Sequence, residues 1–456
     1  MKSIFARIIV LALLVGALSG CAQTAAVTQS TTDHASTAKQ TDPVSPDAAI
    51  PSEETMETAS PAPSEAAEPS NSSETTYDRS TQYDAAVLSN GDAILGGTYT
   101  ATGEDESALE ASGSVTATVT GSLLQKLSGK ASSADGSSFY GLNAGVRVYG
   151  DATVTLTDCE IVADAENATG VFAYDGGTVY LEDCAVTVTG GGAGGVQVAG
   201  GGTLYGTDLT VTSASKAAIR SDRGGGLLVI DGGSYTATGS NGCPAIYSTA
   251  EILVSNADCD SANSRAVIIE GKNSVTLTNC TLSGNDQSSK EGSVRANVLL
   301  YQSMSGDASV GVSTFTMGGG SMVCRSGAMF YCTNTASVIN LNAAELILSQ
   351  DGTLLIVSEG RWGKDGANGG DCTLNAEDQT LEGDILVDAI SSLALNLTNS
   401  SYVGAITGEG EVTVTLDSGS AWTLTGDSYV TALDGDLSGI DLNGFRLYVN
   451  GVLWSR

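Results

Sequence analysis

The stretch that decides the fold is Thr153–Ile161, which reads TVTLTDCEI, because five later segments repeat its pattern. These segments are TVYLEDCAV from Thr178, TLYGTDLTV from Thr203, LLVIDGGSY from Leu227, EILVSNADC from Glu251 and SVTLTNCTL from Ser274. Their first residues lie 23 to 25 positions apart. A fixed period of this size is typical of solenoid proteins, in which each repeat stacks on the one before it.

A second set of short alternating segments lies between the members of the first set. Its members are GVRVYGD from Gly145, GVFAYDG from Gly170, GGVQVAG from Gly194, AAIRSDR from Ala217, PAIYSTA from Pro244 and RAVIIEG from Arg265. Strands this short bury an apolar face only when equivalent strands stack at the usual strand spacing. Alternation then predicts inward Val146, Val154 and Leu156, and turn-forming Asp158 and Asn279 at the bends.

The rungs TLTDC, YLEDC and TLTNC, each with Asp or Asn at the bend before a thiol, resemble the pectate-lyase-like superfamily of right-handed parallel β-helices. Within this resemblance, the run from Ile246 to Gly451 is similar to uncharacterised cell-surface β-helix proteins of clostridial-type bacteria. The resemblance implies an all-β, right-handed parallel β-helix over residues 84–456, with less regular terminal coils from about residue 340. The fold hosts lyases, hydrolases and adhesins alike, so it does not define an activity.

Residues 1–21 have the pattern of a secretory signal, with Lys2 and Arg7 before an apolar run from Ile8 to Leu18. This run is too short for a membrane span. The sequence Leu-Ser-Gly-Cys that ends at Cys21 resembles the bacterial lipobox. The resemblance implies lipid attachment at Cys21 and an exported protein anchored to the bacterial cell membrane, facing the outside. The alternative is a plain signal peptide with a chance cysteine.

Residues 22–83 are predicted to form a disordered Ser/Thr/Pro/Glu linker. Six of the seven prolines lie in this range, and ten acids face two bases between Asp33 and Arg79. A segment with few large apolar residues and a net negative charge cannot offset the entropy lost on ordering. Its expected role is to hold the folded part away from the membrane, and a simple spacer is the alternative.

The whole chain has a formal net charge of −33 and a single histidine, His34, within the expected linker. The acidity disfavours nucleic acid as a partner, because phosphate binding requires patches of Lys and Arg. The polygalacturonase-like motifs Gly-His-Gly and Arg-Ile-Lys do not occur. We therefore assign no catalytic residue. An arrangement of Arg220, Asp222 and Glu270 beside a metal is retained as the enzymatic alternative.

Eight cysteines follow Cys21, and several occupy equivalent inward positions of different repeats, where Leu209 is also accepted. We expect free core thiols, with a Cys159–Cys184 or a Cys324–Cys332 bridge as the alternative. The bend acids, which include Asp158, Asp183 and Asp208, are interpreted as turn formers rather than metal ligands. No metal site or cofactor is assigned, and calcium is retained only as an alternative at these acids.

The aromatic residues expected on the outside of the coils are the first candidates for ligand binding, because flat rings pack against the apolar faces of sugars. These residues are Phe172, Tyr174, Tyr180, Tyr205 and Tyr247, with Arg220 in the same outward column as Phe172 and Tyr247. The alternative is that neighbouring rings only stack to stabilise the sheet.

A second candidate is the glycine-rich loop from Glu359 to Asp371, in which Arg361 and Trp362 lie. It interrupts the coil pattern, and long loops on rigid scaffolds often bind ligands. The alternative is a structural crossover. From both candidates we predict a monomeric, adhesin-like display protein of the cell surface that binds a glycan or another surface partner without catalysis. A polysaccharide lyase or glycoside hydrolase, and a purely structural envelope protein, are the other two hypotheses.

Overall fold

The structure is a computed structural model, and it describes residues 76–240, 242–290 and 293–455. The chain divides into two units, residues 1–72 and Ser73–Arg456. The expectations for the signal at 1–21, for lipid attachment at Cys21 and for most of the linker at 22–83 lie outside the described residues. Within the described part, no helix is long and apolar enough to cross a membrane.

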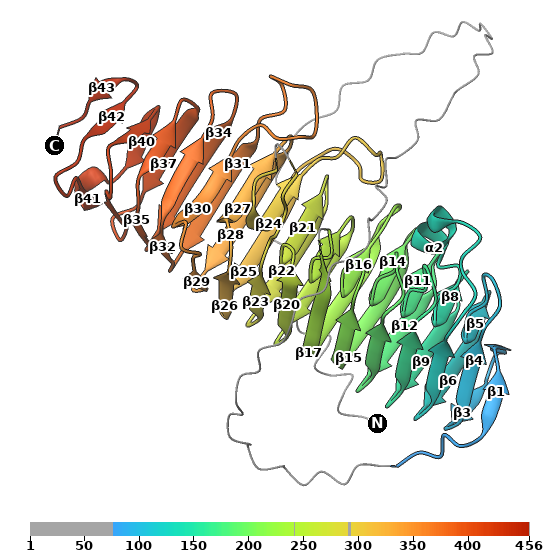
Figure 1. Ribbon diagram of the computed structural model, residues 1–456. Coiled ribbons are helices and arrows are strands. Elements are labelled where there is room, and N and C mark those ends of the chain that lie inside the picture. Colours follow the sequence, from blue (N-terminus) through green and yellow to red (C-terminus); the bar gives the residue numbers. More distant parts are fainter. Residues whose placement is uncertain (1–75, 241, 291–292, 456) are drawn as a thin grey trace, which may run out of the picture. The chain divides into compact units, whose positions relative to one another are not determined.

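The described unit is a stack of coils, and the first face of each coil adds one strand to a 13-stranded sheet (Figure 1). We call this sheet B. Its strands are β2 (Ala86–Val87), β5 (Leu109–Ser112), β8 (Val146–Tyr149), β11 (Val171–Tyr174), β14 (Val196–Ala199), β16 (Ile219–Ser221), β18 (Ile246–Ser248), β21 (Val267–Glu270), β24 (Ala296–Tyr301), β27 (Ala328–Thr333), β30 (Thr353–Val357), β33 (Asp384–Val387) and β36 (Ile406–Gly408).

The second face contains the strands of the TVTLTDCEI repeat. Its members are β3 (Ala93–Leu95), β6 (Thr116–Thr120), β9 (Thr153–Thr157), β12 (Thr178–Glu182), β15 (Gly202–Ser213), β17 (Gly226–Ser240), β19 (Glu251–Ser255), β22 (Ser274–Thr278), β25 (Ser313–Gly318), β28 (Ala336–Asn342), β31 (Asp371–Glu377), β34 (Ser392–Thr398), β37 (Glu411–Leu416) and β40 (Ala432–Gly435). The long strands β15 and β17 continue around the corner, so this face and the third form one 23-stranded sheet.

The third face follows the bend. Its strands are β1 (Gln82–Asp84), β4 (Thr98–Ala101), β7 (Leu123–Lys126), β10 (Glu160–Ala163), β13 (Ala185–Val188), β20 (Asp258–Asn263), β23 (Thr281–Gly284), β26 (Ser321–Cys324) and β29 (Glu345–Ile347). A four-stranded sheet follows it, with β32 (Thr380–Glu382), β35 (Ser401–Val403), β38 (Ala421–Thr423) and β41 (Ile440–Asp441).

The strands pair in parallel, each with its equivalent in the next coil, as the repeats predict. Val154 faces Val179 and Val179 faces Leu204, so equivalent apolar residues stack in register. Val154, Val179 and Val275 are fully buried, and one hydrophobic core runs through the coils. The expected all-β parallel β-helix is therefore confirmed. On the second face, the coils after residue 340 keep this register, although their sequences are less regular, whereas in sheet B the register shifts between β30 and β33.

The eight cysteines of the described part are all free and buried. Cys159 and Cys184 occupy the interior of adjacent coils without a bridge, and the thiol of Cys324 lies near backbone carbonyl oxygens. The expectation of free core thiols is confirmed for these residues. The Sγ atoms of Cys332 and Cys372 lie 3.6 Å apart, a proximity that spacing did not suggest because the two residues belong to different faces.

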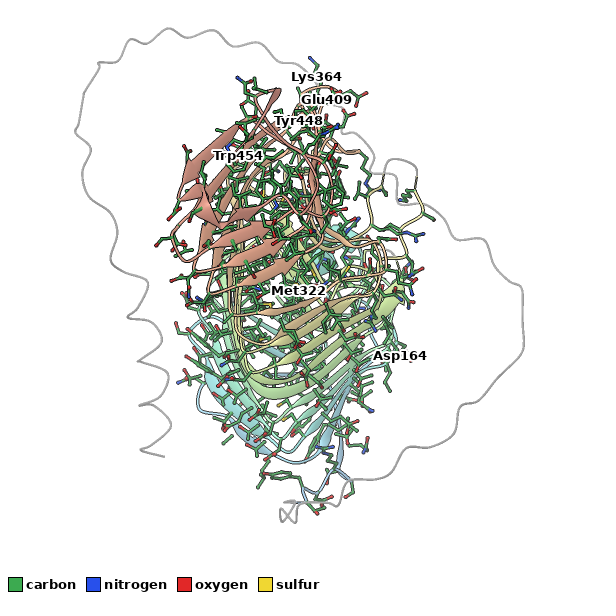
Figure 2. All side chains as sticks on the ribbon, turned by 90° about the vertical axis from the view of Figure 1, so that its left-hand side faces the viewer. Asp164, Met322, Lys364, Glu409, Tyr448 and Trp454 are labelled. Atoms are coloured by element: carbon green, nitrogen blue, oxygen red, sulfur yellow. The ribbon has the colours of Figure 1, made fainter. Side chains whose placement is uncertain are left out.

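The two ends of the stack differ from its middle. At the N-terminal end, Tyr77 donates a hydrogen bond to Asp158 (2.8 Å) and Arg79 pairs with Glu160 (2.9 Å), so contacts with the coils begin before residue 84. At the C-terminal end, β39 (Ser428–Val430) pairs with β42 (Leu447–Val449), which closes on β43 (Val452–Leu453) in antiparallel fashion after the 3₁₀ helix η2 (Leu437–Gly439). Figure 2 views the stack from this end, with Tyr448 and Trp454 labelled.

Candidate ligand-binding site

The outer face of sheet B is covered by chain segments in two places, and both covers involve residues predicted to bind a ligand. The helix α2 (Ala134–Tyr140) packs near β8, β11 and β14 (Figure 1). Further along the stack, an apolar cluster lies outside the coils and consists of Ile268, Ala296, Leu299, Tyr301, Ala328 and Tyr331. Tyr247, Val294, Ile356 and Trp362 pack against this cluster from the adjacent strands and loops.

A cavity of about 190 Å³ adjoins this apolar cluster, and we call it the Trp362 pocket. Its lining consists of Gly242, Tyr247, Arg265, Ile268, Ser288, Lys290, Ser293, Leu299, Tyr301, Arg361 and Trp362. Sheet B supplies the floor, because Tyr247, Ile268 and Leu299 are register partners in consecutive strands. The walls include Ser288, Lys290 and Ser293, which precede β24, and Arg361 and Trp362, which follow β30. The volume is below the roughly 300–1,000 Å³ typical of pockets for drug-sized molecules, so it suits one ring-sized group.

A buried carboxylate fixes the two tyrosines of the floor. Glu270 accepts hydrogen bonds from the hydroxyl groups of Tyr247 (2.6 Å) and Tyr301 (2.8 Å), and also from Ser303. Burial, and then the neighbouring tyrosine and Glu270, raise the pKa of Tyr247 well above its usual value. Burial and Glu270 also raise the pKa of Tyr301. Both hydroxyl groups therefore stay protonated at neutral pH and hold the rings in fixed positions.

Trp362 belongs to the loop after β30, and its ring packs against the ring of Tyr301, with the two centroids 4.6 Å apart. The side-chain amide of Asn368 donates hydrogen bonds to the carbonyl oxygens of Gly360 (2.6 Å) and Trp362 (2.8 Å). The hydroxyl group of Tyr331 donates to the carbonyl oxygen of Glu359 (3.0 Å). The segment that carries Trp362 is therefore held in place. Lys364 is exposed and extends away from the coils (Figure 2).

The described lining of the Trp362 pocket contains three cationic residues, Arg265, Lys290 and Arg361. The guanidinium carbon of Arg361 lies 4.5 Å from the centroid of the Trp362 ring. Arg265 is only 7% exposed, and it pairs with Asp286 at 3.0 Å through one terminal nitrogen. Burial, together with the nearby Arg361, lowers the pKa of Arg265, although Asp286 opposes this. Lys290 is exposed at the rim.

Arg220 lies next to the pocket and is already engaged by other groups. Its guanidinium carbon lies 4.6 Å from the centroid of the Tyr247 ring, and its terminal nitrogen pairs with Asp222 at 2.6 Å. Glu270 is occupied by the two tyrosines. The arrangement that the enzymatic hypothesis requires, with Arg220, Asp222 and Glu270 free to hold a metal and a substrate, therefore does not match these contacts.

The expectation that Phe172 lies exposed on the outside is wrong. Its side chain does point away from the coil interior, in register with Arg147 and Gln197, but it is fully buried. A Cβ atom added to Gly141, the residue that ends α2, would lie 2.5 Å from the Phe172 ring, so the end of this helix closely covers it. Tyr174 is partly buried beside it and makes an edge contact with Tyr140 of α2. Strand alternation cannot reveal such a cover.

Tyr180 and Tyr205 lie on the outside of the second face, and they stack with ring centroids 4.9 Å apart. Tyr180 is 41% exposed. No described residue of the Trp362 pocket comes from this face. The structure therefore unites Tyr247, Arg361 and Trp362 at one site, with Arg220 adjacent, and separates them from Phe172, Tyr174, Tyr180 and Tyr205.

Sequence reasoning did not select Arg265, Lys290 and Tyr301 as site residues. Tyr301 ends the apolar segment ANVLLY (Ala296–Tyr301), and this segment predicts only a buried strand. Its register pairing with Glu270 would have been the useful signal, but a longer loop before β24 interrupts the period. Arg265 begins an aligned repeat and could have been found by its position in that alignment.

The bend acids Asp158, Asp183 and Asp208 adopt left-handed backbone conformations, with φ of 52°, 51° and 51°. Gly232, Asn256 and Asn279 take the same conformation in other coils, which supports the interpretation of the acids as turn formers. Among the described residues there is no group of three or more His, Cys, Asp or Glu side chains that could hold a metal ion.

No protein-family model matches the chain, and no curated protein matches it.

Proposed function

We propose that this protein is a cell-surface display protein that binds glycan without catalysis, and that the Trp362 pocket is its binding site. The observation that carries the proposal is the aromatic arrangement of Tyr247, Tyr301 and Trp362 around a ring-sized cavity. Such a site suits a sugar, because aromatic rings pack against its apolar face while nearby polar groups orient it. The hydrogen bonds to Glu270 and from Asn368 reduce the ordering cost of binding.

We also propose where in the cell the protein acts and in which oligomeric state. Export, lipid attachment at Cys21 and a position on the outside of the bacterial membrane place the pocket where it meets external glycans. The expected linker at 22–83 separates the coils from the membrane. We further propose that the protein acts as a monomer and requires no cofactor. A melting temperature that rises on addition of calcium would show that the folded protein binds this ion, and it would contradict the proposal that no cofactor is required.

The proposal is tested by glycan-array binding of the purified full-length protein in detergent. Trp362→Ala should abolish the array signal, because it removes one wall of the pocket. Tyr180→Ala is the matched control, since it removes an exposed ring from another face of the coils. Equal loss of signal in both variants, or in neither, would refute the assignment of the site.

The enzymatic alternative remains separable from binding. A polysaccharide lyase would produce an unsaturated product, so absorbance would grow when the protein is incubated with uronate polymers and calcium. A glycoside hydrolase would release reducing ends from the same polymers. We expect neither signal, because Arg220 is paired with Asp222, and Glu270 accepts hydrogen bonds from Tyr247 and Tyr301. None of the three side chains is therefore free to act on a substrate. A purely structural envelope protein would give no array binding at all.

A further inference from the structure

We infer that Cys332 and Cys372 form a disulfide bond when the protein folds under oxidising conditions, and that this bond fixes the base of the loop that carries Trp362. Such a bond is independent of the proposed glycan binding. The two thiols are in contact in the core, with their Sγ atoms 3.6 Å apart. A disulfide bond requires about 2.05 Å between the sulfur atoms, so the two atoms need to approach by roughly 1.5 Å. The structure therefore describes the dithiol state of the pair.

The positions of the two cysteines in the stack favour a bond between them. Cys332 belongs to β27 in sheet B, and Cys372 belongs to β31 on the second face of the next coil. The register partner of Cys332 in that coil is Val357. The register partners of Cys372 are Ser337 and Leu393. The two thiols therefore meet from different faces, whereas side chains stacked in register point in parallel, which suits the twist of a disulfide bond poorly.

Other cysteines make contacts that favour a disulfide bond less. The thiol of Cys324 lies within 3.4 Å of three carbonyl oxygens in the segment that follows it. Cys159 and Cys184 are equivalent residues of adjacent coils, and each thiol donates to the carbonyl oxygen two residues earlier. Because these two side chains also approach each other, a bond between them is the competing outcome that the test must separate.

The bond would lie at the base of the Trp362 loop, because Cys372 directly follows Asp371, the last residue of that loop. The backbone amide of Asp371 donates to the carbonyl oxygen of Thr335 (3.0 Å), and the amide of Asn334 donates to the carbonyl oxygen of Asn368 (3.0 Å). These two hydrogen bonds join the end of the loop to the segment after β27. A disulfide bond beside them closes a length of chain that contains the whole loop, and it therefore restricts opening of the loop.

The oxidant is itself a disulfide, such as oxidised glutathione or the disulfide of a thiol oxidoreductase. One cysteine attacks it as a thiolate and forms a mixed disulfide, and the second cysteine then displaces the remaining thiol. One S–S bond forms and one breaks, and the oxidant becomes two thiols that take up the two protons. Contact with Cys332, followed by burial, raises the pKa of Cys372 well above its usual value, so the reaction proceeds while the coils assemble or open locally. Disulfide bonds persist outside the cell, where the proposed export would place the protein.

The test incubates the full-length protein in detergent with oxidised glutathione, at a urea concentration just below its unfolding midpoint, so that local opening exposes the thiols. The remaining free thiols are then blocked, and the protein is digested with trypsin. Trypsin cuts between the two cysteines and places Cys332 in peptide 326–361 and Cys372 in peptide 365–446, neither of which contains another cysteine. We expect mass spectrometry to show these two peptides linked without reductant and separate after reduction. Hydrogen exchange at the amides of Asn334 and Asp371 should be severalfold slower in the oxidised protein than in the reduced protein.

Cys372→Ser should lose both the linked peptides and the slower exchange. Cys324→Ser is the matched control, because it also replaces a buried thiol and should keep both signals. Absence of the link between Cys332 and Cys372 in the wild-type protein would overturn the inference, as would a bond from Cys332 to Cys324 or a bond between Cys159 and Cys184 in its place. A link without slower exchange would overturn the effect on the loop. None of these measurements includes a glycan, so the proposed function stands or falls separately.

Discussion

At the bend of several coils, an Asp or Asn residue adopts a left-handed backbone conformation that most side chains avoid. Asp158, Asp183 and Asp208 do so in three consecutive coils, and Asn256 and Asn279 do so in later ones. Asp and Asn tolerate this left-handed region because their short polar side chains make local hydrogen bonds. Stacking of the coils then places acids next to one another. Partial burial, followed by Asp158 and Asp208, raises the pKa of Asp183.

Asp183→Asn should therefore stabilise the protein at neutral pH, by up to about 0.5 kcal/mol because the side chain is exposed. A raised pKa means that the folded state binds the proton more tightly than the unfolded state, so wild-type stability falls as the pH rises through this range. The gain from the variant should be full at pH 7 and absent below the ordinary pKa of Asp. Urea unfolding at several pH values measures this difference.

Glu182→Gln is the control for this prediction. It removes one negative charge from the neighbouring residue, whose register partners are Thr157 and Thr207 rather than acids. The same pH-dependent gain in this variant would show that general charge reduction, rather than the column of bend acids, is responsible.

At the scale of elements, the loop between β30 and β31 determines whether an outward strand surface becomes a pocket. Strands β18, β21 and β24 present Tyr247, Ile268 and Leu299 as a continuous outward column. Without the loop these residues would form a flat apolar strip. The loop adds Trp362 and Arg361 as a wall of the pocket. The side chain of Asn368 donates hydrogen bonds to the carbonyl oxygens of Gly360 and Trp362, and these bonds hold the loop in shape.

Asn368→Ala should weaken ligand binding roughly tenfold while the coils remain intact. The variant removes the two donors that hold the carbonyl oxygens of Gly360 and Trp362, so binding must order the loop. Far-ultraviolet circular dichroism should be unchanged, because the strand ladders do not depend on this side chain. Titration with the glycan that the array identifies measures the affinity.

Asn375→Ala is a matched control, because Asn375 also uses its side-chain amide, here to bond Asn340 (2.9 Å) in an adjacent coil. It lies outside the described lining of the pocket. We expect a small loss of stability and no loss of affinity. Unchanged affinity in Asn368→Ala would show that the loop keeps its binding conformation without these two hydrogen bonds.

At the scale of the whole described unit, each coil contacts mainly the coil before it and the coil after it. Stability in such a stack is approximately a sum of terms for each coil and each interface. Ser392 faces Glu411 and Leu393 faces Val412, so residues 392–410 make up one full coil. Its apolar positions are equivalent to those of the coils on either side, including Leu381, Tyr402 and Trp422 in successive strands.

Deletion of residues 392–410 should therefore leave a folded, shorter stack, because Glu411 takes the place of Ser392 beside Asp371. The far-ultraviolet circular dichroism per residue should be retained, with a modest fall in the melting temperature. Deletion of residues 392–401 is the control, since it removes part of a coil and destroys the register. Equal loss of structure in both deletions would contradict the independence of the coils.

Much of the architecture could be read directly from the sequence. The period of the TVTLTDCEI segments gave the coil, and alternation within them correctly assigned Val154, Val179 and Val275 to the interior. The acceptance of Leu209 in the thiol column correctly predicted free cysteines. These properties are determined by sequence because each depends on residues that are near in the chain or repeat at a fixed spacing.

Only part of the candidate site could be predicted from the sequence, and the reason is physical. Alternation shows that a side chain points away from the interior, but it does not show whether another segment covers it. Phe172 is buried beneath the end of α2, Tyr180 stays exposed, and Trp362 joins Tyr301 across a distance of many residues in the chain. Local sequence determined the coils and their core, whereas the folding of α2 and the loops over sheet B decided which outward residues form a pocket.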